Sequence, residues 1–467
     1  MGNVREAARG NCAVFDIGKS FAKLSVVTPG GEILVDRRTA TPGLRNTLYD
    51  AFDTDALFDW LLTQLKALGD YRIDRIIPVA HGAACALLDE NEALVMPVQD
   101  YEAVIPAAMV AAYELSRPPF SETLSPRLPK GMNLGAQLFW HSRRDPASFA
   151  RVRWILPYAQ YWTWRLSGAL VSEVSTLGCH TDLWSPATNG FSSLARNEGW
   201  AERFPAMRGA WETAGTLRPV IARATGLPEG TRVCVGVHDS NSALAALLSG
   251  WHNDEPPAML STGTWFIAMA PDGRLDNLQA DRDCMGAVDV FGRPVPCARF
   301  MGGRAYQTIT GGATETVDIA MLDTVMRESA LALPSFLEAG GPFPHMRGEI
   351  RGLRDDTPQA RAALGVLYQA LLSITCLSMI QSGRALVIEG MAAGNPLLCR
   401  LIAALHDGPV VCTASVSAVT LGASALAYRD EVPLPRLRLR QVHPLLAGEF
   451  RAYRDLWLQA CGTPVAA

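Results

Sequence analysis

The sequence predicts an α/β protein with two domains, and three observations lead to that fold class. The chain has 467 residues, which is too long for a single hydrophobic core. Short apolar strands alternate with amphipathic helical segments along most of it. An apolar hairpin with a small polar turn opens each half, at 12–27 and again at 257–269. This repetition predicts duplicated domains that face each other across a cleft, and we expect them to span residues 1–248 and 249–467.

The composition is ordinary for a globular protein and argues against several classes of function. Hydrophobic residues make up 49% of the chain, charged residues make up 19%, and the formal net charge is −4. Because no basic run offsets this charge, we expect no nucleic-acid partner. We expect no membrane partner either, since no uncharged apolar stretch of about 18 residues occurs and the N-terminus lacks an apolar signal core. The ten cysteines show no zinc-ligand spacing, which favours buried, reduced thiols and a cytoplasmic location.

The first hairpin carries a turn that is suited to phosphate. Two predicted strands, Ala13–Phe15 and Ala22–Val27, enclose a turn that contains Gly18–Ser20, and Asp16 stands at its entrance. Backbone amides in a tight turn can hold phosphate, and an aspartate beside them can hold Mg²⁺ directly or through water. An ordinary hairpin without a ligand would account for these residues equally well.

The next elements lead to a second polar strand end. Residues 53–68 place leucine and phenylalanine at helical spacing and predict an amphipathic helix. The apolar strand 76–80 then ends at His81 and Gly82, although a histidine in such a turn is more often structural than a ligand contact. An aromatic stripe further along predicts a core helix from Phe149 to Leu166.

The stretch 231–250 predicts a strand, a sharp turn and a helix. Val233, Val235 and Val237 alternate along one buried strand, and leucines at helical spacing follow after Asp239. His238 and Asp239 therefore stand at the carboxyl end of a strand, where open α/β sheets bind ligands. A carboxylate at that position can accept a proton from a substrate hydroxyl. For such a junction taken alone, helix capping by Asp239 is the commoner explanation.

The second half repeats the phosphate-type turn and adds glycine-rich helix starts. The turn of its hairpin is 261–264, and the double glycine at 302–303 precedes a predicted helix. Glycine permits close backbone approach, and a helix start offers free N–H groups. The buried strand 385–388 ends in a turn at 389–395, and a helix follows from Pro396 to Leu405. The strand 410–413 and the helix 418–427 then complete the predicted second domain.

In this order, the motifs resemble those of the FGGY carbohydrate kinases from about Cys12 to Tyr428. The matching segments are FDIGKSFAKL, the pair His81-Gly82, GVHDS, STGTW, FMGGRAYQ and EGMAAGN. The resemblance implies two actin-like (ribonuclease-H-like) ATPase domains around a central cleft. It also implies a sugar kinase that uses ATP and Mg²⁺, with a small-molecule sugar as substrate and a homodimer as one assembly that it allows.

The resemblance assigns roles to individual residues. Asp239 would be the catalytic base and Asp16 would position the metal. The residues implied for the nucleotide are Gly18, Lys19, Ser20, Thr262, Gly263, Thr264, Gly303, Gln307, Gly390, Met391, Ala392 and Asn395. The residues implied for the sugar are His81, Gly82, Gln99, Asp100 and His238.

The sequence also departs from the family pattern in four places, one of which is the aromatic helix around Trp162, where the lysine of the family's first signature is missing. Met391 stands where the adenosine motif usually has glycine, and Lys19-Ser20 stands where two hydroxyl residues are commoner. The segment 99–102 replaces one that normally carries a sugar-contacting arginine. The substrate therefore stays open, since residues 132–168 look most like rhamnulose and fuculose kinases and the His-Gly pair looks like xylulose kinases. A regulator with little turnover is one alternative, and a chaperone-type ATPase, which would leave the His-Gly segment unexplained, is another.

Overall fold

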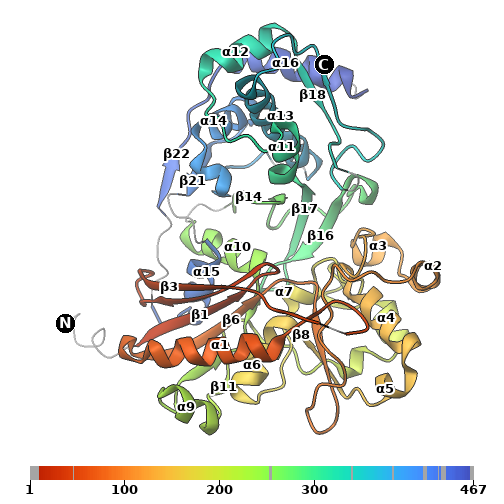
Figure 1. Cartoon of the computed structure of the whole chain (residues 1–467), viewed down its shortest axis with the longest axis vertical. Helices are drawn as coiled ribbons and strands as arrows, with labels where there is room; N and C mark the ends of the chain where they lie inside the picture. The colour runs from red at the N-terminus through yellow and green to blue at the C-terminus, as the bar shows by residue number, and fades with distance from the viewer. Residues whose placement is uncertain are drawn as a thin grey trace. The chain divides into compact units, whose positions relative to one another are not determined.

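The structure, a computed structural model, contains two compact units (Figure 1). It describes residues 10–45, 47–251, 255–337, 340–380, 383–413, 418–429, 431–432 and 438–462. The first unit comprises Met1–Gly250, Gly286–Pro294 and Ala418–Arg436, and the second comprises Trp251–Met285, Val295–Ser417 and Leu437–Ala467. The first division lies within two residues of the expected one, but two later segments return to the first unit. The helix 418–427, which the sequence places at the end of the second domain, packs in the first unit.

A seven-stranded mixed sheet forms the centre of the first unit. Its strand order is β11-β12-β6-β1-β2-β3, and β13 also pairs with β6. The strands are β1 (Asn11–Ile17), β2 (Phe21–Val27), β3 (Ile33–Ala40), β6 (Ile73–Ala80), β11 (Thr213–Thr216), β12 (Arg232–Cys234) and β13 (Val237–His238). The strands β1, β2 and β3 are antiparallel neighbours, whereas β6 runs parallel to β1, β12 and β13.

The second unit repeats this arrangement. Its sheet has the order β16-β17-β15-β14-β20-β21-β22. The strands are β14 (Ala258–Thr262), β15 (Phe266–Met269), β16 (Cys284–Val288), β17 (Pro294–Phe300), β20 (Leu386–Gly390), β21 (Val410–Thr413) and β22 (Leu439–Gln441). From β17 to β21, two antiparallel pairs are followed by two parallel pairs, as they are from β3 to β12. The predicted duplication is confirmed.

Alternation along β1 places helices on both faces of the first sheet. Phe15 and Ile17 pack with α1 (Thr54–Ala67) and α6 (Tyr158–Ser167). Cys12 and Val14 point to the opposite face, where they pack with α10 (Asp239–Gly250) and α15 (Ala418–Ala427). In Figure 1 the blue helix α15 accordingly lies next to the green helix α10, although the two are far apart in sequence.

The core of the second unit surrounds one long helix, α13 (Pro358–Met379). The expectation that the sequence holds no apolar stretch of about 18 residues is wrong, because this helix is long and apolar enough to cross a membrane. However, 78% of its most apolar window is buried inside the protein, as in a core helix. Further helices of this unit are α11 (Gly302–Thr310), α12 (Ile319–Arg327), α14 (Pro396–Leu405) and α16 (Ala447–Ala460). Nine cysteines are buried, Cys461 is half-buried, and all ten are free thiols, as predicted.

Further short elements of the first unit lie outside its main sheet. They are β4 (Gly43–Leu44), β5 (Ala51–Phe52), β7 (Cys85–Leu88), β8 (Trp154–Pro157), β9 (Trp184–Ser185), β10 (Gly190–Phe191), α2 (Ala107–Ser116), α3 (Phe120–Thr123), α4 (Leu134–Arg144), α5 (Pro146–Ala150), α7 (Val174–Leu177), α8 (Ser193–Asn197) and α9 (Pro219–Thr225). The short pair β18 (Leu331–Leu333) and β19 (Glu349–Arg351) belongs to the second unit.

Two predicted elements differ from the structure. The single helix predicted for 149–166 is wrong, because β8 interrupts it by pairing with β7. Ile155 and Leu156 lie in different core clusters, so this apolar stretch alternates between two faces as a strand does. The single strand predicted for 233–237 is broken at Gly236, where φ is 88°. A Cβ at Gly236 would lie 2.7 Å from the carbonyl oxygen of Pro78, which only glycine avoids.

Candidate active site

Three strands of the first unit have polar residues at or next to their carboxyl ends, and these ends lie side by side in the sheet. Ile17 and His238 are both register partners of Ala80, since β1 and β13 flank β6 in parallel. The backbone N–H of His81 also donates to the carbonyl of Ile17 at 3.2 Å. The structure therefore brings together Asp16, His81 and Asp239, which the sequence placed on three separate segments.

Two carboxylates face this edge. The side chain of Asp16 is 21% exposed, and burial raises its pKa to about 6. Lys23, whose Nζ lies 4.0 Å from the Asp16 carboxylate, lowers this pKa, while the negative charge of Asp239 raises it further. Asp16 and Asp239 lie near the carboxyl ends of β1 and β13, which both pair with β6. A cation between them would lower the cost of their mutual repulsion.

Asp239 is the first residue of α10, and its side chain is 32% exposed. Its Oδ1 accepts a hydrogen bond from the N–H of Ser240 at 2.5 Å and lies 3.3 Å from Nε2 of His238. Among the described residues it accepts no bond from an N–H two or three positions further on, as an N-cap carboxylate would. Capping therefore does not explain this aspartate.

His81 and Gln99 carry buried polar atoms without partners. Both ring nitrogens of His81 and both amide atoms of Gln99 lack a hydrogen bond within the described chain. The His81 ring lies between Phe52, Tyr101 and Tyr158, with centroid distances of 5.3, 5.2 and 5.2 Å. Burial lowers the pKa of His81 to about 4, so its imidazole is neutral at neutral pH.

The unpartnered ring nitrogens of His81 and amide atoms of Gln99 are suited to form hydrogen bonds with hydroxyl groups. A neutral imidazole offers one donor and one acceptor, a side-chain amide offers both, and a hydroxyl can serve either. Buried polar atoms normally have partners, so four orphaned atoms in two predicted site residues call for an explanation. A bound polyol would provide it.

The structure places the side chain of Lys19 with residues predicted for the sugar, although the sequence assigned Lys19 to phosphate. Its ammonium contacts the carboxylate of Asp100 and lies 3.7 Å from that of Glu102. It also lies 5.5 Å from the ring centroids of Phe52 and Tyr101. The backbone of the turn keeps its tight form, with the Gly18 N–H donating to the Phe21 carbonyl at 3.0 Å, and Ser20 is exposed.

The pair Gly82 and His238 is held in close contact. A Cβ at Gly82 would lie 2.8 Å from Nε2 of His238, so glycine is needed for the ring to occupy its position. The ring is buried, and burial lowers the pKa of His238. Its Nε2 lies beside the Asp239 carboxylate, which makes His238 a neighbour of the predicted base.

In the second unit, the segments predicted for the nucleotide also gather at one strand edge. Thr262 and Gly390 are register partners at the ends of β14 and β20. The Thr262 hydroxyl donates to the Glu389 carbonyl and accepts from the Ala392 N–H at 2.8 Å. At Gly390, φ is 81° and a Cβ would lie 2.2 Å from the Thr262 carbonyl oxygen, so the turn requires glycine there.

The start of α11 joins this edge. A Cβ at Gly303 would lie 2.5 Å from the carbonyl oxygen of Gly263, and the Gly303 N–H donates to the Thr264 carbonyl at 3.3 Å. Gln307 is exposed one turn further along the helix. The hairpin turn and a helix N-terminus therefore lie together, an arrangement that suits an anionic group.

Met391 and Asn395 occupy different settings in the turn that follows β20. Met391 is 77% exposed, so its side chain is not packed into the protein. Asn395 is the N-cap of α14, and its Oδ1 accepts from the Leu398 N–H at 3.1 Å. This capping bond gives Asn395 a structural role independent of any nucleotide.

The residues present are compatible with ATP and Mg²⁺. No group of three or more His, Cys, Asp or Glu residues that could hold a metal occurs in the described ranges. Magnesium in phosphate-transferring sites needs only one or two carboxylates, because phosphates and water complete its coordination. Asp16, with its raised pKa and a second carboxylate nearby, fits that requirement. Thr262–Thr264 and the start of α11 fit a phosphate chain.

The sequence interpretation missed several residues of this edge. Lys23 was not assigned a role, although its Nζ lies near Asp16 and donates to Thr420 Oγ1 at 2.7 Å. Glu173 is fully buried, and its Oε2 accepts from the hydroxyl of Ser175, which in turn accepts from the backbone N–H of His238 at 3.2 Å. Lys23 lies within FDIGKSFAKL, the segment that resembles the family's first phosphate turn, so a signal for it was present. The sequence around Glu173 gave no signal.

The fold and the two strand edges define the class of protein. Duplicated mixed sheets with this strand order, one with paired carboxylates and one with a glycine-lined turn, define an actin-like ATPase fold of two α/β domains. The model of the FGGY family N-terminal domain matches residues 13–246, and the model of the carbohydrate kinase FGGY C-terminal domain matches 254–434. The chain belongs to the FGGY family of carbohydrate kinases.

Comparisons with individual proteins agree with this assignment. A crystal structure of a carbohydrate kinase from Novosphingobium aromaticivorans is 38% identical, with a TM-score of 0.89, and the match covers 97% of this chain and 98% of that one. A ligand-bound xylulose kinase from Lactobacillus acidophilus shares the fold, with a TM-score of 0.82 at 14% identity over 97% of both chains.

A curated relative, L-fuculokinase of Salmonella typhi, is 26% identical over 272 residues, covering 56% of this chain and 57% of that protein. The chain thus spans little more than half the length of the curated relatives it matches.

Proposed function

We propose that this protein is an ATP-dependent carbohydrate kinase that phosphorylates a primary hydroxyl of a ketose or a related sugar or polyol. The observation that carries the proposal is the set of orphaned polar atoms of His81 and Gln99 on the same unit as Asp16 and Asp239. A plain ATPase needs the carboxylates and phosphate turns but has no use for unpartnered buried groups that match hydroxyls.

In the proposed mechanism, His81, Gln99 and Asp100 hold the sugar, with His238 and Gly82 beside them. Asp239 would accept the proton of the attacking hydroxyl, whose oxygen takes the phosphoryl group while ADP leaves. Asp16 would hold the metal. In the first unit the turn at Gly18–Ser20 would bind phosphate, and in the second unit Thr262–Thr264 and Gly303 would do so. When bound, MgATP supplies the transferred phosphoryl group and the metal charge that stabilises it. Such a transfer depends mainly on positioning and charge, so one base and one metal suffice.

The contact of Lys19 with Asp100 bears on the class of sugar. The ammonium is partly neutralised by Asp100 and Glu102, so the predicted sugar end carries no excess positive charge. A neutral ketose or polyol suits this balance better than a sugar acid, whose carboxylate would require an unpaired cation. The name of the curated relative, L-fuculokinase, also refers to a neutral sugar.

The second candidate is a sugar- or nucleotide-binding regulator on the same fold with little turnover. The unusual residues Lys19 and Met391 favour it. The presence of both Asp16 and Asp239 at one strand edge favours the kinase, because a regulator needs no general base.

A coupled ADP-release assay over a panel of ketoses, aldoses, polyols and sugar acids tests the proposal. We expect sugar-dependent ADP release with at least one neutral ketose or polyol and only slow release without sugar. Binding of sugar without turnover would favour the regulator, and sugar-independent ADP release would favour the plain ATPase. Turnover restricted to sugar acids would refute the assignment of a neutral substrate.

A further inference from the structure

A cavity of about 350 Å³ lies in the first unit at the amino ends of the parallel strands, opposite the carboxyl ends that carry Asp16 and Asp239. Arg75 and Arg232, register partners near the beginnings of β6 and β12, form part of its wall. Because these strands run parallel, their other ends carry the candidate active site. Along β6, Arg75 lies five residues before Ala80, roughly 17 Å at the usual rise of a strand. The cavity is therefore separate from the site described above.

Arginine side chains dominate the polar wall of this space, which we call the arginine cavity. Four arginines and two glutamates line it: Arg75, Arg208, Arg232, Arg429, Glu212 and Glu431. Asp74 lies beside the wall and pairs with Arg75 at 2.9 Å and with Arg232 at 3.8 Å. Even with Asp74 counted, the arginines outnumber the carboxylates among the described residues, so this part of the wall carries an excess of positive charge.

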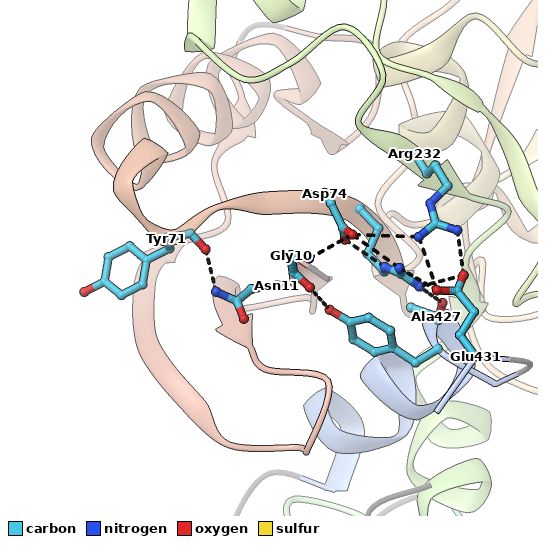
Figure 2. Close-up of polar contacts among 9 residues, drawn as sticks. Gly10, Asn11, Tyr71, Asp74, Arg232, Ala427 and Glu431 are labelled. Carbon is cyan, nitrogen blue, oxygen red and sulfur yellow. Dashed lines mark hydrogen bonds and ion pairs between the residues drawn. The ribbon is translucent and has the colours of Figure 1, made fainter. Parts of the chain in front are cut away.

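The wall already holds one anionic group of the chain itself. Arg75 donates to the two Glu431 oxygens at 3.2 and 3.0 Å, and Arg232 donates to the same carboxylate at 2.6 Å. Figure 2 shows Arg232, Asp74 and Glu431 converging in this network. Burial alone would raise the pKa of Glu431, but hydrogen bonds from the two arginines lower it to about 2. The cavity wall is thus built to stabilise an oxyanion.

Arg429 is the arginine of the cavity that has no carboxylate partner among the described residues. Its guanidinium instead stacks on the rings of Trp211 and Phe291, at 4.2 and 4.3 Å from their centroids. Stacking fixes the plane of a guanidinium without neutralising it and leaves its N–H edge available. Arg208, by contrast, pairs with Glu212 at 3.0 Å. The uncompensated charge of the arginine cavity therefore resides at Arg429.

We propose that the arginine cavity binds a small organic phosphate monoester, with Arg429 as the principal ligand of its phosphate. The phosphate oxygens match the planar donor edge of a guanidinium. The volume of about 350 Å³ exceeds what inorganic phosphate fills and lies at the small end of metabolite sites, so an organic body fits against Trp211 and Leu426. This binding site is independent of the proposed kinase activity.

Calorimetry on the full chain tests the proposal, with inorganic phosphate, fructose 6-phosphate, ribose 5-phosphate and unphosphorylated fructose as probes. We expect at least one sugar phosphate to bind more tightly than inorganic phosphate. Arg429→Gln should weaken that binding about ten-fold or more, the effect of losing a charge-assisted pair. Arg223→Gln, which changes an exposed arginine of α9 elsewhere on the unit, is the matched control and should bind as the wild type does.

Binding of a sugar phosphate at the active site would not respond to Arg429→Gln, so the variant separates the two sites. Arg429 is exposed, and a melting curve checks that the variant is folded. Equal affinity of the wild type and Arg429→Gln for every phosphate probe would overturn the proposal, as would a lack of binding at millimolar concentrations. Affinity for inorganic phosphate equal to that for sugar phosphates would overturn the organic part of the assignment.

Discussion

Replacing Glu173 by glutamine tests how strongly burial raises the pKa of this carboxyl and how that pKa makes the stability of the fold depend on pH. Glu173 is fully buried, and burial raises the pKa of its carboxyl from 4.5 to about 8. Its Oε2 accepts from the Ser175 N–H at 3.0 Å and from the Ser175 hydroxyl at 2.6 Å, while Oε1 has no partner among the described residues. Glutamine keeps an oxygen for Ser175 and removes the ionisation.

The direction of the pH effect follows from the raised pKa. The folded protein binds the Glu173 proton more tightly than the unfolded chain does, so protonation favours folding. This contribution is fully present below pH 4.5 and is lost as the pH rises through 8. At 1.36 kcal/mol per pKa unit, the difference amounts to about 4 kcal/mol between pH 5 and pH 9. Since the side chain is fully buried, solvent screening does not reduce this figure.

Melting curves of the wild type and Glu173→Gln from pH 5 to pH 9 measure the effect. The wild type should lose more stability than the variant across this range, by several degrees in melting temperature. Glu229→Gln, which changes an exposed glutamate, is the control and should follow the wild type. Parallel pH curves for the wild type and Glu173→Gln would refute the argument, because they would mean that Glu173 titrates alike in the folded and unfolded chains.

Four further predictions follow from the same structure. Asp239→Asn should reduce sugar phosphorylation by about 10²–10⁴-fold with sugar binding retained by calorimetry, and near-normal turnover would exclude it as the base. Asp16→Ala should raise the Mg²⁺ concentration needed for turnover more than it changes sugar affinity, and an unchanged Mg²⁺ titration would leave Asp16 a turn residue. Gly422→Ala should destabilise the fold by about 1–3 kcal/mol, because the new Cβ would lie 1.7 Å from the Ser242 carbonyl oxygen, and an unchanged melting temperature would contradict this. Met391→Gly should leave ATP and GTP affinities within a few-fold, since the side chain is 77% exposed, whereas tighter ATP binding would show that Met391 narrows the site.

Elements with strong local signals could be predicted from the sequence. The helix α14 begins at Pro396 and ends at Leu405, as predicted, because an asparagine N-cap and a proline at the first helical position mark its start. The segment 149–166 was mispredicted because its apolar run suits either period, and pairing of β8 with β7 decided the outcome. Local pattern does not encode that pairing.

Part of the candidate site could likewise be predicted from the sequence, and part of it could not. That Asp16, His81 and Asp239 lie together could be anticipated, because the carboxyl ends of parallel strands share one sheet edge. The contact of Lys19 with Asp100 could not, since it depends on how a distant loop returns to the first hairpin. The burial of Glu173 depends likewise on packing of the whole unit, which its polar neighbours in the sequence do not reveal.

The placement of α15 shows that the unit that carries Asp16 and Asp239 includes a segment from the far end of the chain. This helix follows the nucleotide-type strands in sequence, yet Ala423 and Leu426 pack in the first unit with Cys12 and Val14. The Ser242 hydroxyl of α10 donates to the carbonyl of Val419 at 2.7 Å.

A fragment that ends at residue 248 would therefore expose the apolar face of β1 and leave α10, which begins at Asp239, without its neighbouring helix. Lys23 would also lose its hydrogen bond to Thr420, and with it one constraint on the cation beside Asp16. The geometry of the predicted base and of the predicted metal ligand thus depends on residues more than 170 positions later in the chain. For this reason the first domain, as the sequence delimits it, does not contain the whole of the first compact unit.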